Sequence, residues 1–556
     1  MAELYGALVK HLRLSDSVIL VVTTGFVTHQ IFKRYEPDAP LPVGVLLLAV
    51  PTLLIPFVAP FAPSTFLAIT FTYVWYWASV LTNVAVYRLA PWHPLAQYPG
   101  PILNKLSKLT MAWKMYEGQQ HLYYQKMHEK YGDIVRVGPN ELSISRADTI
   151  APILGPSGLP KGVFWYNRAP AGSPGALITY RDRDQHKARR RLWDRAFSTA
   201  SVKGYDDLII ARMRELTAQF EKRSGQVIDL SLWVSFFSYD FMGDMAFGAG
   251  FDMMQNGSDV TGVWAALDAM NIMTAVLAHI PWSFTYQRLI PGIGGPRERF
   301  LNVAKAYVSR RIQRGSIIKD LFYHLTDEAG LEPVKPTMPA VFADGALAVV
   351  AGSDTTATTL SVLFYYLLIQ PEHFQRLRAE IDQFFPDKTE TTDFTKMVGM
   401  PFLNACMNEA LRLVPPVLDG SPRSSPDSQG CTVGPYYIPP GQQILPHFYT
   451  IHHNPDYFTD PDSFIPDRWL PSSAFASAPG VKHEITAFNP FSFGPMACVG
   501  KNLALVELRG VTCFVVQKFD LARPEGFKEG EWIRGLGDAF VVTRPPLMVR
   551  VQARSW

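Results

Sequence analysis

Residues 491–500 read Phe-Ser-Phe-Gly-Pro-Met-Ala-Cys-Val-Gly, and a long, mostly apolar run with helical character follows them. Cys498 therefore stands just before a predicted helix N-terminus, where free backbone N–H groups and the helix dipole favour a thiolate. Gly494 and Gly500 allow the backbone to lie close to a flat partner, and Phe491 is placed to shield the sulfur from water. An isolated cysteine is more often a buried structural residue, so this motif needs support from the rest of the chain.

The apolar segment 339–370 is a second informative element. It is long enough to cross a membrane, but Asp344 and the polar cluster at 353–356 make a bilayer span costly, so we predict a helix buried in protein. The Thr355 hydroxyl is expected to bond the carbonyl one turn earlier and to loosen the helix there. Asp354 and Thr355 beside such a groove suit proton transfer during oxygen activation. A tightly packed helix with small residues explains this segment equally well.

Glu409 and Arg412 lie three residues apart and share one face of a predicted helix. By itself such a pair is a surface interaction that adds only ~0.2–0.5 kcal/mol. The proline-bounded stretch 464–469 (FIPDRW) brings in Arg468. We predict that the three side chains form one buried charge network.

These segments together resemble the cytochrome P-450 family over about residues 95–556. The resemblance is carried by four motifs in order: AGSDTT at 351–356, ExxR at 409–412, FxPxRW at 464–469 and FxxGxxxCxG at 491–500. It implies a mainly helical α+β haem fold with small sheets, and a haem-thiolate monooxygenase that contains haem b. Several apolar N-terminal segments make the chain most similar to fungal membrane-bound members.

The resemblance also implies roles for single residues. Cys498 would be the axial thiolate ligand of the iron, and Asp354 and Thr355 would lie on the oxygen-binding side. Glu409, Arg412 and Arg468 would lock the protein beneath the haem.

Matching to the family implies the haem propionate partners too. His186 and Arg190 occupy the spacing at which the family often has Trp and Arg, and Arg423 matches another frequent partner. A guanidinium suits a carboxylate because it donates two parallel hydrogen bonds. One departure is Met496, which stands where the family usually has an arginine; we expect weaker haem retention as a result.

The N-terminal region differs in composition from the rest. Segments 43–63 and 66–87 contain no charged residue, and each is close to the about 20 apolar residues that cross a bilayer as a helix. A third segment, 17–33, is weaker because it is shorter and includes His29. A buried helical hairpin in a soluble domain is the alternative. We predict a membrane anchor over 1–90, with two or three spans and the side of the N-terminus open.

Positive residues such as Lys33, Arg34 and Arg88 lie on one side of the two strong segments. Because positive flanks favour the cytoplasmic side, the domain after the anchor should face the cytosol, at the endoplasmic reticulum membrane. Residues 91–101 contain four prolines and form the predicted hinge, and 102–556 form the catalytic domain.

The net charge of +3 gives no reason to expect nucleic acid, and the four scattered cysteines suggest neither disulfides nor zinc. The resemblance implies electrons from NADPH through cytochrome P-450 reductase, with cytochrome b5 as a second donor. The basic stretch 187–195 and Lys501 would attract that acidic partner. We expect a lipophilic substrate, such as a terpenoid or other secondary metabolite, bound near 162–170 and 417–420. A haem-thiolate isomerase or dehydratase that does not use O2, and a haem sensor, remain alternatives.

Overall fold

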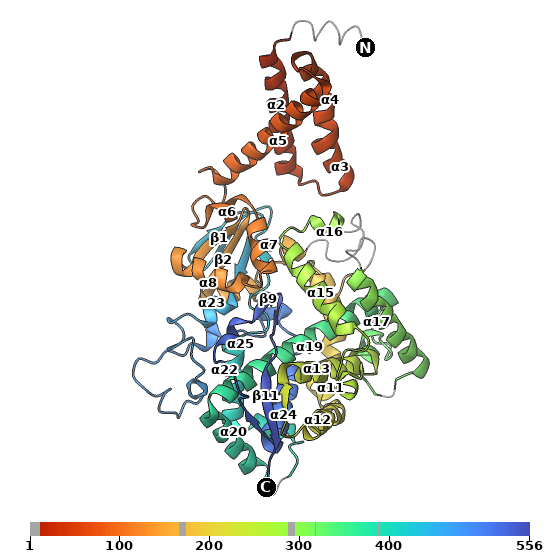
Figure 1. Ribbon diagram of the computed structural model, residues 1–556, viewed down its shortest axis with the longest axis vertical. Helices are drawn as coiled ribbons and strands as arrows, with labels where there is room; N and C mark the ends of the chain where they lie inside the picture. Colours follow the sequence, from red (N-terminus) through yellow and green to blue (C-terminus); the bar gives the residue numbers. More distant parts are fainter. Residues whose placement is uncertain (1–11, 166–173, 287–294, 317, 387–388, 556) are drawn as a thin grey trace. The chain divides into compact units, whose positions relative to one another are not determined.

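The computed structural model describes residues 12–165, 174–286, 295–316, 318–386 and 389–555. The expected pocket segment 162–170 lies outside the described residues from 166 onward. The chain forms two compact units: one comprises residues 1–110 with 136–139 and 282–293, and the other comprises 111–135, 140–281 and 294–556. Each is considered separately below, and Figure 1 labels their helices and strands.

The first unit contains three long apolar helical segments. Its helices are α2 (Leu14–Tyr35), α3 (Pro40–Gly44), α4 (Val50–Val58), α5 (Thr65–Leu89), α6 (Ile102–Leu106) and α16 (Ser283–Tyr286). A π-helical turn, Val45–Ala49, joins α3 to α4, so that Pro40–Phe61 is one helical rod of 22 residues. The predicted hinge at 91–101 contains turns and no helix, as its prolines require.

Hydrogen bonds between side chains and backbone join these three segments. Ser17 Oγ on α2 donates to the carbonyl of Phe57 near the end of α4, at 2.7 Å. Ser79 Oγ on α5 donates to the carbonyl of Val22 on α2, also at 2.7 Å, and Lys33 Nζ lies 3.9 Å from the Tyr87 ring centroid. The N-terminal part of α2 contacts the C-terminal part of α4, so α3–α4 runs antiparallel to α2. Successive positions along α2 contact successive positions along α5, so α2 and α5 run parallel to each other.

Four described helical segments are long and apolar enough to cross a membrane: Leu14–Tyr35, Pro40–Phe61, Thr65–Leu89 and Met338–Ile369. In each of the first three, less than a third of the most apolar 18-residue stretch is buried. In Met338–Ile369, 72% of the corresponding stretch is buried inside protein. The weaker candidate, segment 17–33, lies in the helix Leu14–Tyr35, which has 22 residues, as does Pro40–Phe61. The prediction that 339–370 is a core helix is confirmed.

Helices make up most of the remaining chain. They are α7 (Leu109–Tyr116), α8 (Gln120–Tyr131), α9 (Ile150–Leu154), α10 (Arg183–Ala196), α11 (Thr199–Lys203), α12 (Asp206–Glu221), α13 (Leu230–Phe247), α14 (Met253–Asn256), α15 (Val263–Leu277), α17 (Gly295–Arg314), α18 (Leu321–Leu325), α19 (Met338–Ile369), α20 (Pro371–Phe384), α21 (Phe394–Val398), α22 (Pro401–Leu413), α23 (Phe448–His452), α24 (Lys501–Lys518) and α25 (Glu531–Arg534). The predicted mainly helical class with small sheets is confirmed.

The strands are short and form small sheets. They are β1 (Ile134–Gly138), β2 (Glu141–Ile144), β3 (Val227–Asp229), β4 (Arg423–Ser424), β5 (Cys431–Val433), β6 (Tyr436–Ile438), β7 (Gln443–Pro446), β8 (Phe519–Ala522), β9 (Gly537–Ala539), β10 (Val541–Thr543) and β11 (Met548–Ala553). One sheet has the order β1-β2-β7-β4, with β2 parallel and β4 antiparallel to β7. A second has the order β3-β11-β8.

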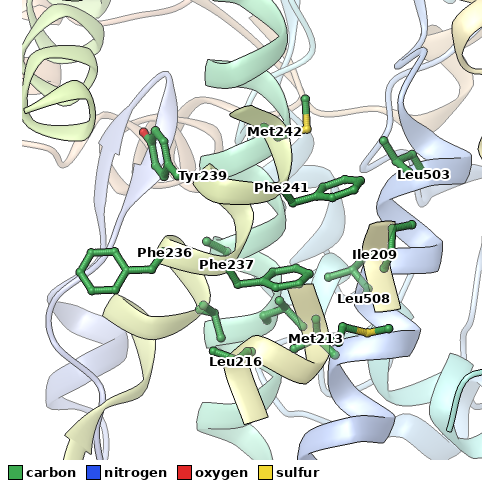
Figure 2. Close-up of a cluster of buried hydrophobic side chains, with 14 of the residues drawn as sticks. Ile209, Met213, Leu216, Phe236, Phe237, Tyr239, Phe241, Met242, Leu503 and Leu508 are labelled. Atoms are coloured by element: carbon green, nitrogen blue, oxygen red, sulfur yellow. The ribbon is translucent and has the colours of Figure 1, made fainter. Parts of the chain in front are cut away.

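The hydrophobic core lies around α13 and α19, which pack against each other along much of their length. Figure 2 shows side chains of α12 and α24, among them Met213 and Leu508, beside Phe237 and Phe241 of α13. Gly352 on α19 has a structural role here, because a Cβ at this position would collide with the Met242 side chain. The glycine therefore leaves room for the Met242 side chain between the two helices.

Candidate active site

The loop before α24 presents Cys498 to a cavity. The Cys498 backbone N–H donates to the carbonyl of Phe491 at 2.9 Å, which closes the loop. Both side chains line a cavity of about 320 Å³. Burial raises the pKa of the Cys498 thiol, while the backbone N–H of Gly500 and the charge of Arg190 act to lower it. The sulfur thus faces open space at the N-terminus of a long helix, as the sequence indicated.

The two glycines of this loop have different roles. Gly494 has φ +76°, and a Cβ there would collide with the carbonyl of Leu154 in α9. It is not among the cavity-lining residues, so the close approach that it allows is to α9 and not to a flat ligand. Gly500 does line the cavity, and a Cβ on it would make only ordinary contacts, with Phe197 and the Cys498 sulfur.

One stripe of α19 forms another wall of the cavity. Its members are Leu347, Ala348, Val350, Ala351, Gly352, Thr355, Thr356 and Thr359. Thr355 Oγ1 donates to the carbonyl of Ala351 at 2.6 Å, which is the hydrogen bond predicted from the sequence. The expected loosening of the helix is absent, because α19 is α-helical without interruption from Met338 to Ile369. A hydroxyl bond to the i−4 carbonyl can be accommodated within a regular helix.

Asp354 does not line the same cavity as Thr355. Its carboxylate accepts a hydrogen bond from the Tyr239 hydroxyl at 3.1 Å and lies 3.6 Å from Arg544 Nη2. It borders a second cavity of about 230 Å³, whose lining is about as polar as apolar, together with Asp268 and Arg544. Burial raises the pKa of Asp354, although Arg544 and Tyr239 act to lower it. Adjacent helical residues point about 100° apart, which separates the two side chains.

Asp344 has a role that the sequence did not reveal. Its carboxylate accepts hydrogen bonds from Arg189 Nε at 2.5 Å, from Trp193 Nε1 at 2.9 Å and from the backbone N–H of Leu177 at 2.7 Å. This buried carboxylate therefore fastens α10 to α19. Because α10 also carries Arg190, Asp344 helps to fix one side of the cavity. Only its occurrence in an apolar helix hinted at such pairing.

Glu409, Arg412 and Arg468 form the buried network that the sequence predicted. Arg412 Nε and Nη2 donate to Glu409 Oε2 and Oε1 at 3.0 and 2.8 Å, and Arg468 Nε donates to Oε1 at 3.0 Å. The Trp469 indole and the backbone N–H of Ile465 add bonds of 2.9 Å. Burial would raise the pKa of Glu409, but the two arginines lower it below its usual range. The network joins α22 to the 464–469 loop.

A group of basic side chains lines the main cavity: Lys161, His186, Arg190 and Arg423. Arg423 is only 2% exposed, yet no described carboxylate pairs with it. Its Nη1 donates to the Met496 sulfur at 3.0 Å, and its Nε has no partner among the described residues. Burial, with the neighbouring Arg183, lowers the pKa of Arg423 to about 10. A buried guanidinium of this kind calls for an anion.

Arg190 and His186 lie near the same end of the cavity. Arg190 Nη1 donates to the carbonyl of Ala497 and its Nε to Asp194, both at 2.8 Å, so it ties α10 to the cysteine loop. Burial, with the charges of Lys161, Arg190 and Arg423, lowers the pKa of His186 to about 4. His186 is therefore neutral near pH 7 unless an anion offsets these charges.

Comparison with known proteins identifies the family. Residues 97–551 match the family model described as Cytochrome P450. The chain belongs to the cytochrome P450 family. The resemblance inferred from the four motifs is thereby confirmed, and with it the assignment to the oxidoreductases as a monooxygenase.

Several fungal cytochrome P450 enzymes are similar along most of the chain. Cytochrome P450 monooxygenase FCK2 of Fusarium pseudograminearum is 33% identical over 484 residues, which cover 86% of this chain and 85% of that protein. Tryprostatin B 6-hydroxylase of Aspergillus fumigatus is 31% identical, with coverage of 84% and 82%. Cytochrome P450 monooxygenase notG' of Aspergillus versicolor is 31% identical, with coverage of 94% and 95%.

Membership of the cytochrome P450 family implies a haem iron with a cysteine thiolate ligand. The cavity residues fit such a group. A thiol faces one region of the cavity, and the buried, unpaired Arg423 supplies the positive charge that a haem carboxylate requires. Lys161, which no motif indicated, adds a second buried cation to this lining.

Proposed function

We propose that this protein is a haem-thiolate monooxygenase that inserts one oxygen atom from O2 into a lipophilic small molecule. The observation that carries the proposal is Cys498, whose sulfur opens into the cavity that Thr355 of α19 also lines. The cofactor is haem b, with Cys498 as the axial ligand. A thiolate-ligated haem supplies the electron density that promotes O–O cleavage.

The haem carboxylates would be held by the basic end of the cavity. Arg423 is the principal partner, because it is buried and lacks a carboxylate within the described structure. His186 and Lys161 lie close enough to share this role, whereas Arg190 already holds the Ala497 carbonyl. A carboxylate beside His186 would raise its pKa from the value of about 4 caused by burial and by the basic neighbours.

Thr355 and Asp354 would handle protons from the two different cavities that border α19. The Thr355 hydroxyl faces the main cavity, where it can hold a water molecule or a reacting oxygen. Asp354 borders the second cavity, so we infer that it takes protons from water there. Tyr239 and Arg544 hold its carboxylate on that side, and the side chain must turn past them to serve Thr355.

The substrate is expected to be largely apolar. The lining includes Trp165, Leu347, Val417, Phe448 and Phe540, as is usual for a site that binds a hydrophobic small molecule. Asp419 and Ser421 are polar residues of the lining that suit a hydroxyl or amine. A fungal secondary metabolite such as a terpenoid or an alkaloid suits this lining. One relative, Tryprostatin B 6-hydroxylase, is named for the hydroxylation of a small molecule.

The N-terminal unit would anchor the enzyme in the endoplasmic reticulum membrane by three spans. The up-down-up order of α2, α3–α4 and α5 puts Lys33, Arg34 and Arg88 at the same end. Positive residues favour the cytoplasmic side, so the catalytic domain would face the cytosol and the N-terminus the lumen. Residues 1–90 form the anchor, 91–101 the hinge and 102–556 the catalytic domain in this proposal.

Electrons would come from NADPH through cytochrome P450 reductase, with cytochrome b5 as a second donor. Lys187 and Lys501 are exposed and suit an acidic partner. Other members of the basic stretch are already paired, since Arg191 and Arg195 contact Glu332 at 3.0 and 2.7 Å. The positive charge that is free to attract an acidic partner is therefore smaller than the sequence suggested.

The test uses the full-length protein in membranes with the reductase, NADPH and a panel of terpenoids and alkaloids under ¹⁸O2. The proposal predicts products that carry one labelled oxygen and that require NADPH. A product formed equally without O2 and NADPH would instead support the isomerase or dehydratase alternative. If no compound is consumed while haem and reductase are both present, the sensor alternative gains and the proposal fails.

A further inference from the structure

A stretch of the chain on both sides of the hinge carries positive charge without any acid. Residues 39–116 contain no aspartate and no glutamate, although they include Arg88, Lys105, Lys108 and Lys114. Helices α5 and α6 and the hinge between them lie in this stretch. Cations that gather there cannot be balanced by an acid of the same stretch, and the proposed chemistry does not use them.

The Tyr87 ring, near the C-terminal end of α5, lies among several of the basic side chains of the first unit. Lys33 Nζ of α2 lies 3.9 Å from the centroid of this ring. The ring centroid of His93, in the hinge, lies 5.0 Å from that of Tyr87. Arg136 of β1 follows, with its Nη2 at 3.2 Å from His93 Nε2. A helix, the hinge and a strand thus bring basic groups to one place.

Arg88 and Lys105 join the same group from α5 and α6. Arg88 Nη1 donates to the carbonyl of Leu106, the residue after Lys105, at 2.5 Å. Burial and, after it, the charge of Arg88 lower the pKa of Arg136 to about 10. Burial and the charge of Arg136 also lower the pKa of Lys105. The three cations therefore lie close enough to repel one another.

No described carboxylate pairs with these cations. Arg136 is 1% exposed, and its guanidinium bonds the carbonyl of Pro139, at 2.9 and 3.2 Å, besides the histidine. The Lys105 ammonium bonds to no described residue. The charge of Glu36, just after α2, reaches Arg88, but no ion pair joins Glu36 to a described residue. Because cations withdrawn from water need a counter-charge, this group calls for an anion.

Exposed apolar side chains beside the cations indicate what kind of anion it is. Trp92 in the hinge is 71% exposed, and Ile102 and Leu103 of α6 are each 65% exposed. A free phosphate ion would give these side chains no partner. A phospholipid offers a phosphate to the cations and acyl chains to the apolar residues, and tryptophan is common at the level of lipid headgroups. Basic pockets beside membrane helices bind such headgroups.

We infer that Lys33, Arg88 and Lys105 bind the phosphate group of an anionic phospholipid at the hinge. The inference rests on the proposed membrane anchor and not on the proposed chemistry. Each lysine ammonium has three donors and a guanidinium has five, so Arg88 keeps donors for the phosphate besides the one that holds the Leu106 carbonyl. Arg136 is too deeply buried to touch the lipid, and it adds positive charge from behind.

Native mass spectrometry of the full-length protein in detergent tests the site. Phosphatidylserine, phosphatidylcholine and inorganic phosphate are added separately, and the fraction of protein that retains each is measured. Phosphatidylserine should be retained most. Arg88→Gln and Lys105→Gln should each lower its retention by ~5-fold, the contribution of one basic residue near an anionic lipid. The matched control is Lys114→Gln, because the Lys114 ammonium is already paired with Glu117 at 2.6 Å.

Three results would overturn the inference. They are equal retention of the two lipids, retention of inorganic phosphate equal to that of phosphatidylserine, and a loss in Lys114→Gln as large as that in Lys105→Gln. Lys105 lies beyond the membrane helices, so its variant decides even if Arg88→Gln fails to insert. If alkaline carbonate releases the protein from membranes, the proposed anchor fails and this inference fails with it. If the protein stays embedded but shows no preference for phosphatidylserine, this inference alone fails.

Discussion

Arg423 is a buried, positively charged side chain whose hydrogen-bond partner is a sulfur atom. It is 2% exposed, and its only hydrogen bond from the guanidinium to a described side chain goes to the Met496 sulfur. A thioether is a weak acceptor, so this contact does little to offset the cost of burying the charge. The haem carboxylate of the proposed function would supply the missing anion.

Replacing Arg423 with glutamine should therefore weaken haem binding. A charge-assisted hydrogen bond contributes about 1.5–3 kcal/mol, so haem loss should accelerate by ~10-fold or more. Transfer of haem to an apoglobin acceptor measures this rate. Arg183→Gln is a suitable control, since Arg183 is exposed and does not line the cavity. Equal rates for wild type and Arg423→Gln would contradict the role assigned to this side chain.

Met496 should leave the haem less firmly held than the usual arginine does. In Met496→Arg, a second guanidinium beside Arg423 would reach the same carboxylate, and haem loss should slow down. The same haem-transfer assay measures the effect. An unchanged rate would show that the position does not matter for retention, and a faster rate in the variant would show that repulsion from Arg423 outweighs the new hydrogen bond.

Element by element, the sequence predicted local pairings better than distant ones. Glu409 and Arg412 are one turn apart, and their burial follows once Arg468 joins them. Asp344 and Arg189 are 155 residues apart, and no periodicity relates them. The different orientations of Asp354 and Thr355 could have been foreseen, because consecutive residues on a helix diverge by about 100°. The family pattern, which treats them as a pair, hid this.

The attachment of α10 to α19 through Asp344 can be tested separately. Asp344→Asn leaves Arg189 buried with a neutral partner, and breaking a buried ion pair costs about 3–5 kcal/mol. The variant should unfold at a lower temperature and retain less haem, because Arg190 and His186 lie on α10. Asp382→Asn is a control for charge removal at an ion pair nearer the surface, with Arg554. Equal thermal midpoints for Asp344→Asn and wild type would contradict the claim.

At the scale of the whole molecule, five buried histidines near α8 and α23 link stability to pH: His121, His128, His447, His452 and His453. Burial lowers the pKa of His121 and His128 to about 4, and that of His452 and His453 to about 3. It lowers the pKa of His447 well below the ordinary value, and His128 and His121 add to this effect. All five are neutral in the folded protein near pH 7.

Stability should therefore fall as the pH decreases from about 6.5 toward about 4. In that window the unfolded chain binds protons on these histidines and the folded chain does not, so protonation favours unfolding. Burial raises the pKa of Asp538 to about 7 and that of Asp240 to about 6, and it also raises the pKa of Asp354. These and other buried acids act in the opposite direction, so the decrease is smaller than the five histidines alone would give. The midpoint of thermal unfolding, followed by tryptophan fluorescence, should be lower near pH 5 than near pH 7.

His121→Phe provides the matched variant for this prediction. Phenylalanine keeps the edge-to-face contact with Tyr449, whose ring centroid lies 5.0 Å from that of His121, and it does not titrate. The decrease in thermal midpoint on acidification should be smaller in this variant by the contribution of one proton. An equal decrease in both proteins would show that His121 does not contribute.

The central claim is that Cys498 ligates haem iron, and the carbon monoxide difference spectrum of the reduced protein tests it most directly. We predict a strongly red-shifted Soret band for the wild type and for Cys431→Ser, a control at a partly exposed cysteine in β5. Cys498→Ser should lose that band. A folded, haem-loaded wild type without the band, or a Cys498→Ser protein that retains it, would contradict the account.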